Sequence, residues 1–485
     1  MNVKVVLNVL GKALLIEAVF MIFPLLAGVV YNENTYMNFL IPIILLLGIG
    51  LFLISIKPKD NGIFAKEGFL IVSLVWIAFS LFGSIPFVIG KEAELSSFIN
   101  ALFETISGFT TTGSSTLTDV TVISKSAMTW RILTHWLGGM GVLVFVLALL
   151  PSSTSGVMHV FRAESPGPSA SKFVGKIKYT ARVLYGIYIL LTLIETLLLS
   201  FSGIGFYDSL MTALSTAGTG GFSLYNESIA YYGSAYIEMV VACFMLIFSI
   251  NFNVYYLILI GGLRKAIKSE ELRIFIIMLT IATLVIALNI MNSVGGFMVG
   301  LRYAFFQVTA ISSTTGFATA NFDVWPSLSK VIIFLLMFVG ACGGSTGGGL
   351  KVSRCAILVK SSMAETKKTF FTRSVITTKF ENKALNKEMV SSVRTFFIMY
   401  IFIILLSTLI LSLDSFANGD IMTHFSASLT CISNVGPGFN AVGPTCNFAS
   451  YSGFSKIVLS VVMLFGRLEI FPMMILFIPK TWRRS

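Results

Sequence analysis

Charged residues are scarce in this chain of 485 residues: Asp, Glu, Lys and Arg make up 12% of it, against 55% hydrophobic residues. A soluble protein of this length cannot bury so much apolar surface, which excludes soluble enzymes and soluble binding proteins. The mean hydropathy of +0.88 and the abundance of phenylalanine and glycine are typical of helical membrane proteins. We therefore expect an all-α polytopic membrane protein.

Cysteine and histidine are also rare, with 5 and 3 residues. The cysteines form no CxxC pair, and His135, His159 and His424 are too scattered along the chain to suggest a metal site. No nucleophile–base pair stands out either. These absences argue against a membrane enzyme, and we expect no covalently bound cofactor.

Negatively charged residues are the third shortage: the chain has 22 Asp and Glu but 34 Lys and Arg, which gives a formal net charge of +12. Most cations fall into clusters that alternate with poorly charged loops, as expected when basic loops stay in the cytoplasm. The clusters are Lys4 and Lys12, residues 57–66, 162–182, 264–273 and 351–394, and Lys480, Arg483 and Arg484. The positive charge thus predicts topology, with both termini cytoplasmic, and not nucleic-acid binding.

Ten apolar segments are long enough to cross the roughly 30 Å hydrocarbon core of a bilayer as helices. They are residues 13–30, 37–56, 68–89, 133–150, 183–201, 237–261, 274–291, 331–361, 395–413 and 457–478. The first two form an N-terminal two-helix extension, residues 1–60. The other eight form four parallel helix–element–helix repeats, at residues 66–160, 178–265, 271–360 and 388–485. Four repeats of one orientation predict a pseudo-fourfold axis along the membrane normal.

A short element that ends in glycine lies between the two helices of each repeat. The copies are FETISGFTTTG ending at Gly113, MTALSTAGTGG ending at Gly221, FQVTAISSTTG ending at Gly316 and SASLTCISNVG ending at Gly436. Each is too short to cross the membrane, and we interpret it as a re-entrant pore helix followed by an extended loop. Ser96 or Ser97, Asp208 and Asp420 are the expected N-caps of the first, second and fourth pore helices. The third has no obvious cap.

The C-terminal end of such a helix directs its carbonyl dipoles toward the membrane centre, where they favour a cation. Glycine permits the left-handed backbone angles and the close approach that turn the next carbonyl oxygens toward an axis. Four such strands would form rings of oxygens that replace the hydration shell of an ion, as in potassium channels. The predicted K⁺ selectivity filter comprises Thr111, Thr112, Gly113, Thr219, Gly220, Gly221, Thr314, Thr315, Gly316, Asn434, Val435 and Gly436. The ion is expected at Thr112, Gly113, Gly220, Gly221, Thr315, Gly316, Val435 and Gly436.

A different interpretation of the elements is that their small residues only allow close helix packing. Four copies between paired helices favour the filter. The fourth copy carries Asn434 and Val435 where the others carry threonine or glycine, so we expect a less regular ring.

A glycine-rich stretch, GACGGSTGGGLK at residues 340–351, interrupts the second helix of the third repeat. It does not match the phosphate-binding GxxxxGK[ST] pattern, because Leu350 separates Gly349 from Lys351. Just inside the filter, a flexible stretch would obstruct the pore and act as a gate; the alternative is a helix break that is merely tolerated. The predicted gate residues are Gly343, Gly344, Ser345, Thr346, Gly347, Gly348, Gly349, Lys351 and Arg467.

Arg467 lies in the last apolar segment, where a charge is costly and is expected to face the protein interior. It would either stand in the pore as a barrier to cations, or bind the glycine-rich stretch, or pair with Glu469, Glu17, Glu104 or Glu195. Glu104, within the first pore helix, either raises the cation density near the pore or holds the pore helices together.

The four elements, the GACGGSTGGGLK stretch and the GRLEIFP segment around Arg467 together resemble the Trk/Ktr/HKT superfamily of potassium transporters. The N-terminal helix pair resembles its bacterial TrkH branch. The resemblance covers nearly the whole chain. It implies potassium uptake across the bacterial inner membrane, with Gly113, Gly221, Gly316 and Gly436 as filter glycines, residues 340–351 as the intramembrane gating loop and Arg467 as the pore arginine.

The resemblance also implies a homodimer with one pore per protomer, controlled by a cytosolic nucleotide-binding ring of TrkA type. The basic segments 162–182, 264–273 and 351–394 are then either the docking surface for that partner or a surface that binds lipid headgroups. Rb⁺ is expected to pass as well as K⁺. The alternative to a channel-like pore is a symporter that couples K⁺ to H⁺ or Na⁺, and Glu104 is the candidate titratable group.

Overall fold

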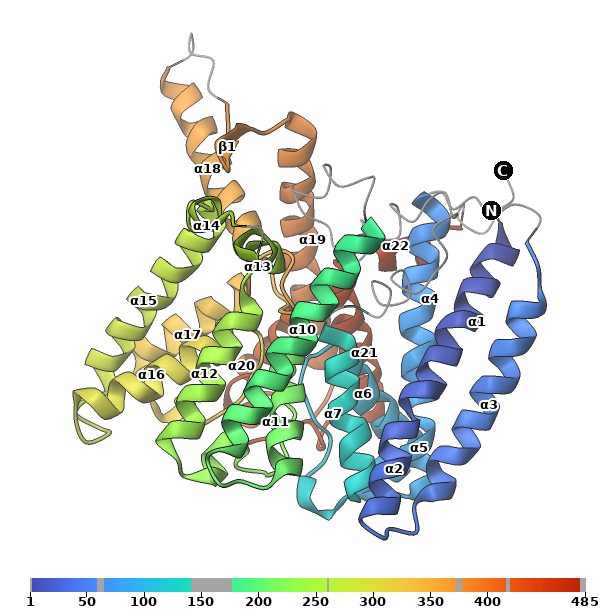
Figure 1. Cartoon of the computed structure of the whole chain (residues 1–485). Coiled ribbons are helices and arrows are strands. Elements are labelled where there is room, and N and C mark those ends of the chain that lie inside the picture. Colours follow the sequence, from blue (N-terminus) through green and yellow to red (C-terminus); the bar gives the residue numbers. More distant parts are fainter. Residues whose placement is uncertain are drawn as a thin grey trace.

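The computed structural model describes residues 2–58, 65–139, 141, 177–259, 261–371, 377–415 and 419–479 (Figure 1). These residues are mostly helical. The longer helices are α1 (Val3–Phe20), α3 (Tyr36–Ser55), α4 (Ala65–Gly83), α7 (Lys125–Gly139), α10 (Ile177–Ser200), α12 (Ala235–Ser249), α15 (Glu270–Ile290), α17 (Ser327–Val339), α18 (Val352–Phe370), α19 (Lys387–Leu411) and α21 (Gly453–Arg467). The four helices that precede the repeated glycines are α6 (Phe98–Phe109), α11 (Phe206–Gly218), α16 (Phe297–Ser312) and α20 (Ile421–Ser433).

Shorter elements connect these helices. The α-helical ones are α2 (Ile22–Val30), α5 (Ile85–Gly90), α13 (Phe252–Leu259), α14 (Leu263–Ile267) and α22 (Phe471–Phe477). Turns of 3₁₀-helix are η1 (Ala93–Ser96), η2 (Val120–Val122), η4 (Ser228–Tyr232), η5 (Phe322–Val324) and η7 (Asn440–Val442). Strands β1 (Lys379–Phe380) and β2 (Lys383–Ala384) pair antiparallel.

The N-terminal helices pack as an antiparallel pair against the rest of the body (Figure 1). Helix α1 contacts both α3 and α4, and α2 contacts α7. A Cβ atom at Gly11 would lie 2.7 Å from the carbonyl oxygen of Gly50, so small residues at this crossing allow the two helix backbones to approach closely.

The same order of helices then recurs four times: a long helix, a short helix and a second helix. The long helices are α4, α10, α15 and α19, the short ones α6, α11, α16 and α20, and the second ones α7, α12, α17 and α21. In every group the short helix contacts the second helix, and in the third group α15 contacts both α16 and α17.

Helix breaks are more frequent than the sequence predicts. We expected only the third repeat to have an interrupted second helix, but α12 and α13 meet at an 88° bend after Ser249. The predicted span 237–261 is therefore two helices. The predicted span 457–478 also divides, because α21 ends at Arg467 and Ile470 takes a φ of +64° before α22.

Because of these breaks, fewer helices meet a simple length criterion for crossing a membrane than the ten predicted segments. The described residues contain six helices that are long and apolar enough, or seven if the bent pair α12–α13 counts as one. Helix α17 is apolar but shorter. The predicted segment 133–150 lies largely outside the described residues, so the count of ten and the re-entrant course of the short helices stay predictions.

Helices α18 and α19 and the β1–β2 hairpin extend beyond the end of the body at which α1 begins (Figure 1). The hairpin is attached to the start of α15. Glu381 accepts hydrogen bonds from the Ser269 hydroxyl at 2.8 Å and from the Glu270 N–H at 2.9 Å, and Glu270 pairs with Lys360 of α18. The carboxylate of Glu381 thus satisfies donors at a helix N-terminus from more than a hundred residues away.

Candidate functional site

The four repeated glycines form a closed ring. Each has a positive φ, between +78° and +100°, and a Cβ atom added to any one of them would meet a carbonyl oxygen of the next repeat. The contacts are Gly113 to Gly220 O, Gly221 to Thr315 O, Gly316 to Val435 O, and Gly436 to Thr112 O at 2.7 Å. The order of contacts runs from the first repeat to the fourth and back to the first, so the repeats surround one axis.

Each short helix ends in the same way before its ring glycine. One or two residues after the helix end, the backbone is left-handed, with φ between +51° and +60°, at Thr111, Thr219, Thr314 and Asn434. The next N–H then turns back to a carbonyl five residues earlier, as in a Schellman motif; the pairs are Thr112 to Ser107, Gly220 to Ser215, Thr315 to Ala310 and Val435 to Thr430, at 2.9–3.1 Å. Because C=O and N–H point in opposite directions across a trans peptide, the carbonyl of each left-handed residue points away from its helix.

The side chains of the predicted filter residues are occupied within the protein. The hydroxyl of Thr314 accepts from the Gly348 N–H at 2.7 Å, and the hydroxyl of Thr219 donates to the Gly218 carbonyl at 2.7 Å. The hydroxyl of Thr315 bonds to Ser313 at 2.7 Å. These hydroxyls brace the ring, and backbone carbonyls remain as the ligands that it can offer to an ion.

The fourth repeat departs from the others in its side chain and in its ring glycine, because Gly436 has φ +100° against +78° to +82° in the other three. Asn434 has φ +54°, in the same range as the three threonines. Its side-chain amide donates to the Thr112 hydroxyl at 2.9 Å and to the Met463 carbonyl at 3.1 Å. The asparagine that replaces threonine in the fourth repeat therefore forms a side-chain hydrogen bond that links this repeat to the first.

The expected caps of the short helices are partly right. Asp420 caps α20, because its carboxylate accepts from the N–H groups of Met422 and Thr423 at 3.3 and 3.0 Å. Ser97 is the N-cap residue of α6 but makes no capping side-chain hydrogen bond. Asp208 lies inside the first turn of α11 and accepts from the Tyr225 hydroxyl at 2.9 Å. Helix α16 begins after Gly296 without a side-chain cap.

The glycine-rich loop, residues 340–351, lies directly against one side of the ring. A Cβ atom at Gly348 would lie 2.5 Å from the Ser433 carbonyl oxygen, and one at Gly347 would lie 2.7 Å from the Ser313 carbonyl oxygen. Lys351 closes the loop on itself by donating to the Gly347 carbonyl at 2.5 Å. The loop thus contacts the bases of the third and fourth ring strands.

Arg467 joins the loop to the first repeat. Its guanidinium donates to the Thr346 carbonyl at 2.8 Å, to the Thr111 hydroxyl at 3.2 Å and to the Gly139 carbonyl at 2.7 Å, and it also contacts the Gly138 carbonyl. Of the alternatives for this residue, the structure places it on the loop. Glu469, one of the four carboxylates considered as partners of Arg467, pairs with Arg354.

Glu104 is fully engaged behind the ring. Its carboxylate accepts from Arg131 Nε at 2.6 Å, from the Ser115 hydroxyl at 2.9 Å and from the Thr116 N–H at 2.9 Å. Arg131 in turn donates to the Ser223 carbonyl at 3.2 Å. The buried ion pair therefore ties the strand after the first ring glycine to the strand after the second.

Two further residues of this site, Glu271 and His135, were not predicted from the sequence. Glu271, in the first turn of α15, accepts from the loop at Gly343 N–H at 2.7 Å and from the Ser353 N–H at 3.2 Å. His135 bonds to the Gly108 carbonyl at 2.7 Å and stacks on Phe222. Nothing local marks Glu271, which lies within a basic cluster, whereas His135 follows Arg131 by four residues and so shares its helix face.

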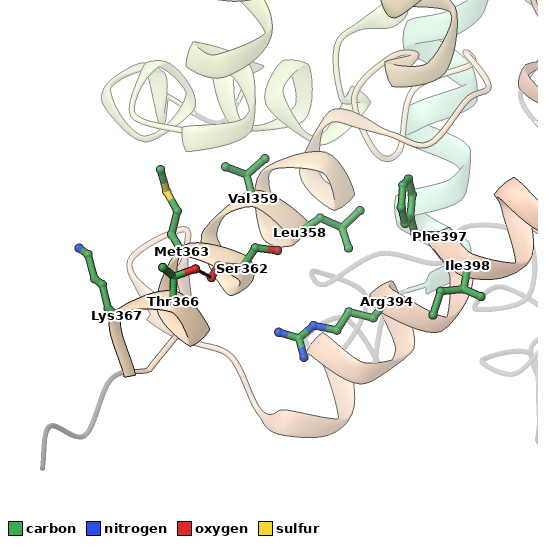
Figure 2. A pocket seen from close by; sticks show the side chains of 9 residues that line it. All are labelled: Leu358, Val359, Ser362, Met363, Thr366, Lys367, Arg394, Phe397 and Ile398. Carbon is green, nitrogen blue, oxygen red and sulfur yellow. Dashed lines mark hydrogen bonds between the residues drawn. The ribbon is translucent and has the colours of Figure 1, made fainter. Parts of the chain in front are cut away.

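A groove of about 800 Å³ lies apart from the ring, between α18 and α19. Figure 2 shows that Arg394 points from α19 toward α18 while the walls are mainly apolar. The lining residues are Leu358, Val359, Ser362, Met363, Thr366, Lys367, Arg394, Phe397 and Ile398. None of them belongs to the predicted filter or gate.

Comparisons with known proteins agree over the whole chain. The family model described as TrkH, a cation transport protein, matches residues 35–484. The Trk system potassium uptake protein TrkH of Salmonella typhimurium is 34% identical, and that of Escherichia coli K12 is 33% identical, each over 100% of both chains. The crystal structure of the potassium transporter TrkH from Vibrio parahaemolyticus is 30% identical and superimposes with a TM-score of 0.88, covering 100% of both chains. The chain belongs to the TrkH family of cation transport proteins.

Proposed function

We propose that this chain mediates potassium uptake through a channel-like pore whose selectivity filter is the ring of four glycine strands. The observation that carries the proposal is the closed ring itself, in which each glycine approaches a carbonyl of the next repeat. The carbonyl oxygens around the axis are suited to replacing the hydration shell of a K⁺ ion. The names of the relatives, as potassium uptake proteins, support the same ion.

The proposed gate is the loop of residues 340–351 together with Arg467. Its contact with the third and fourth ring strands, and the bonds of Arg467 to Thr346 and Thr111, support a loop that lies across the ion path. A cation beside this path would also repel a permeating ion. Release of the loop would remove both obstacles.

Coupling of K⁺ to H⁺ or Na⁺ is less well supported than a channel-like pore. A proton-coupled mechanism needs a titratable group that can lose its partner, and the carboxylate of Glu104 is bound to Arg131, Ser115 and Thr116. We therefore infer that Glu104 holds the filter strands together.

The proposed setting is the bacterial inner membrane, with both termini cytoplasmic and four pore repeats at the boundaries predicted from the sequence. We further propose a homodimer and a cytosolic nucleotide-binding partner. The hairpin and the basic end of α18 extend beyond the body on the side of α1's start (Figure 1), which supports a docking surface there. The basic segment 162–176 lies outside the described residues.

The test is ion flux through the purified protein in liposomes. We expect Rb⁺ uptake, and a reversal potential that follows the K⁺ gradient alone when Na⁺ and pH gradients are imposed across the same membrane. A reversal potential that moves with the pH or Na⁺ gradient would establish a symporter instead, and absence of Rb⁺ flux would reject the proposal.

A further inference from the structure

The loop of residues 340–351 docks against the break in the second helix of the second repeat. Helix α12 ends at Ser249, and α13 starts at Phe252 at an angle of 88°. In a continuous helix the N–H of Phe252 would donate to the carbonyl of Phe248, four residues earlier. The bend separates these two groups, so each needs another partner.

The loop supplies both of those partners. The Phe248 carbonyl accepts from the backbone N–H of Thr346 at 3.4 Å and from its hydroxyl at 3.1 Å. The Phe252 N–H donates to the Gly344 carbonyl at 3.0 Å. The donor and the acceptor of one lost helical hydrogen bond are thus each paired with the loop, the donor with Gly344 and the acceptor with Thr346.

The next helical bond, from Asn253 N–H to the Ser249 carbonyl, is replaced in the same manner. The Ser249 carbonyl accepts from the loop at the Cys342 N–H at 3.1 Å. The Asn253 N–H donates to the side-chain Oδ1 of Asn251 at 2.9 Å. Asn251 also lies against the loop, because a Cβ atom at Gly344 would be 3.1 Å from its Oδ1.

We propose that the loop and the broken helix α12–α13 form one two-state gate, because they compete for the same backbone hydrogen-bonding groups, and that Asn251 is a positioning residue that favours the loop-docked state. This inference rests on the proposed function of the loop. In the docked state the helix is broken and the loop closes the pore. In the released state the helix closes its own bonds from Phe252 to Phe248 and from Asn253 to Ser249.

The exchange explains how a buried loop can leave without leaving unpaired backbone groups behind it. Inside a membrane protein, an N–H or C=O group without a partner is costly. Since the straightened helix satisfies the carbonyls that the loop abandons, the Phe248 and Ser249 carbonyls have a hydrogen-bond partner in both states. A partner protein that pulls on the loop then needs to supply only the remaining free-energy difference between the docked and released states.

Two substitutions of Asn251 should move the gate in opposite directions. Asn251→Ala removes the acceptor that replaces a helical bond and raises helix propensity, so we expect a roughly five-fold rise in basal Rb⁺ flux in liposomes. Asn251→Pro removes an N–H and prevents a continuous helix, while the extended ψ of 146° at Ile250 suits a residue before proline. We expect its flux to fall below that of the wild type.

The native thiol of Cys342 gives a second measurement that does not depend on ion flux. It is buried in the docked loop, at 1% exposure. In a variant that keeps Cys342 as its only cysteine, Asn251→Ala should accelerate modification by a small methanethiosulfonate reagent, and Asn251→Pro should slow it. A change in folding alone would not produce this opposite order.

Two further variants serve as controls. Asn251→Asp keeps an oxygen acceptor at the same position and should restore the flux and thiol reactivity of the wild type. Asn253→Ala alters the same residue type two positions along, where the side chain makes no hydrogen bond among the described residues, and should change neither quantity.

Equal flux and equal thiol reactivity in Asn251→Ala and the wild type would overturn the inference, as would a shift of Asn251→Ala and Asn251→Pro in the same direction. If Rb⁺ flux is absent from every variant, the proposed function is wrong, and the order of thiol reactivity alone then decides whether loop and helix compete.

Discussion

At the scale of single residues, the ring depends on backbone angles that most side chains avoid. Three threonines, Thr111, Thr219 and Thr314, take left-handed angles, which are rare for β-branched residues and cost roughly 1–2 kcal/mol each. Asparagine at position 434 tolerates the same angles better. The Schellman hydrogen bonds that follow each of these residues hold the strained conformation in place.

Gly316→Ser is the most direct residue-scale test of the filter. The glycine has φ +78°, and an added Cβ would meet the Val435 carbonyl and lie 2.7 Å from Pro437 Cδ. We expect the ring to distort and the permeability ratio of K⁺ to Na⁺ to fall about ten-fold, corresponding to ~1.4 kcal/mol of lost discrimination, measured by reversal potentials under bi-ionic conditions.

Gly295→Ser is the matched control, because Gly295 has φ +88° but no neighbouring atom within 4 Å of an added Cβ. It carries the same backbone strain outside the ring and should leave the ratio unchanged. Equal ratios in Gly316→Ser and the wild type would remove Gly316 from the filter.

Glu104→Gln separates a structural role from a proton-coupling role. Without its charge, the Arg131 guanidinium is left buried and uncompensated, and we expect a loss of about 3–5 kcal/mol in the free energy of unfolding, seen as a lower melting temperature of the purified protein. Glu365→Gln, at an exposed ion pair, should cost no more than about 1 kcal/mol. A stable Glu104→Gln variant with an altered pH dependence of flux would instead favour a symporter.

At the scale of elements, sequence repetition identified the four short helices and their glycines, because these features recur within the chain. The glycine-rich loop was recognisable from its own composition. The break between α12 and α13 was not recognisable in this way, because the two residues at the break, Ile250 and Asn251, are neither glycine nor proline. Its partners lie in the loop, 98 residues away at Thr346, so no local pattern marks it.

A single methyl group in the loop should test whether it closes the pore. Gly348→Ala would place a Cβ 2.5 Å from the Ser433 carbonyl and 3.1 Å from Asn434 Cβ, which forces the loop away from the ring. We expect basal Rb⁺ flux to rise several-fold. Gly343→Ala, whose Cβ would meet only ordinary contacts at 3.4 Å, should raise it much less. Wild-type flux in Gly348→Ala would argue that the loop does not obstruct the path.

At the scale of the whole molecule, charge and hydropathy were enough to predict a helical membrane protein with an added N-terminal pair. They were not enough to predict where helices end. The apolar segment 237–261 breaks where the loop of another repeat satisfies the freed backbone groups, whereas 457–478 breaks between Arg467 and Pro472, with the Ile470 N–H bonded locally to the Phe465 carbonyl. The ring, too, forms only when the repeats assemble, since each ring glycine is required by its close contact with a carbonyl oxygen of the next repeat.

If the four glycine strands hold K⁺ on one axis, anomalous diffraction from crystals grown in Rb⁺ should reveal the ion there. We expect Rb⁺ density on the axis between Gly113, Gly221, Gly316 and Gly436, near the carbonyl oxygens of the preceding residues. Rb⁺ sites that lie only outside this ring, with the ring itself intact, would contradict this expectation.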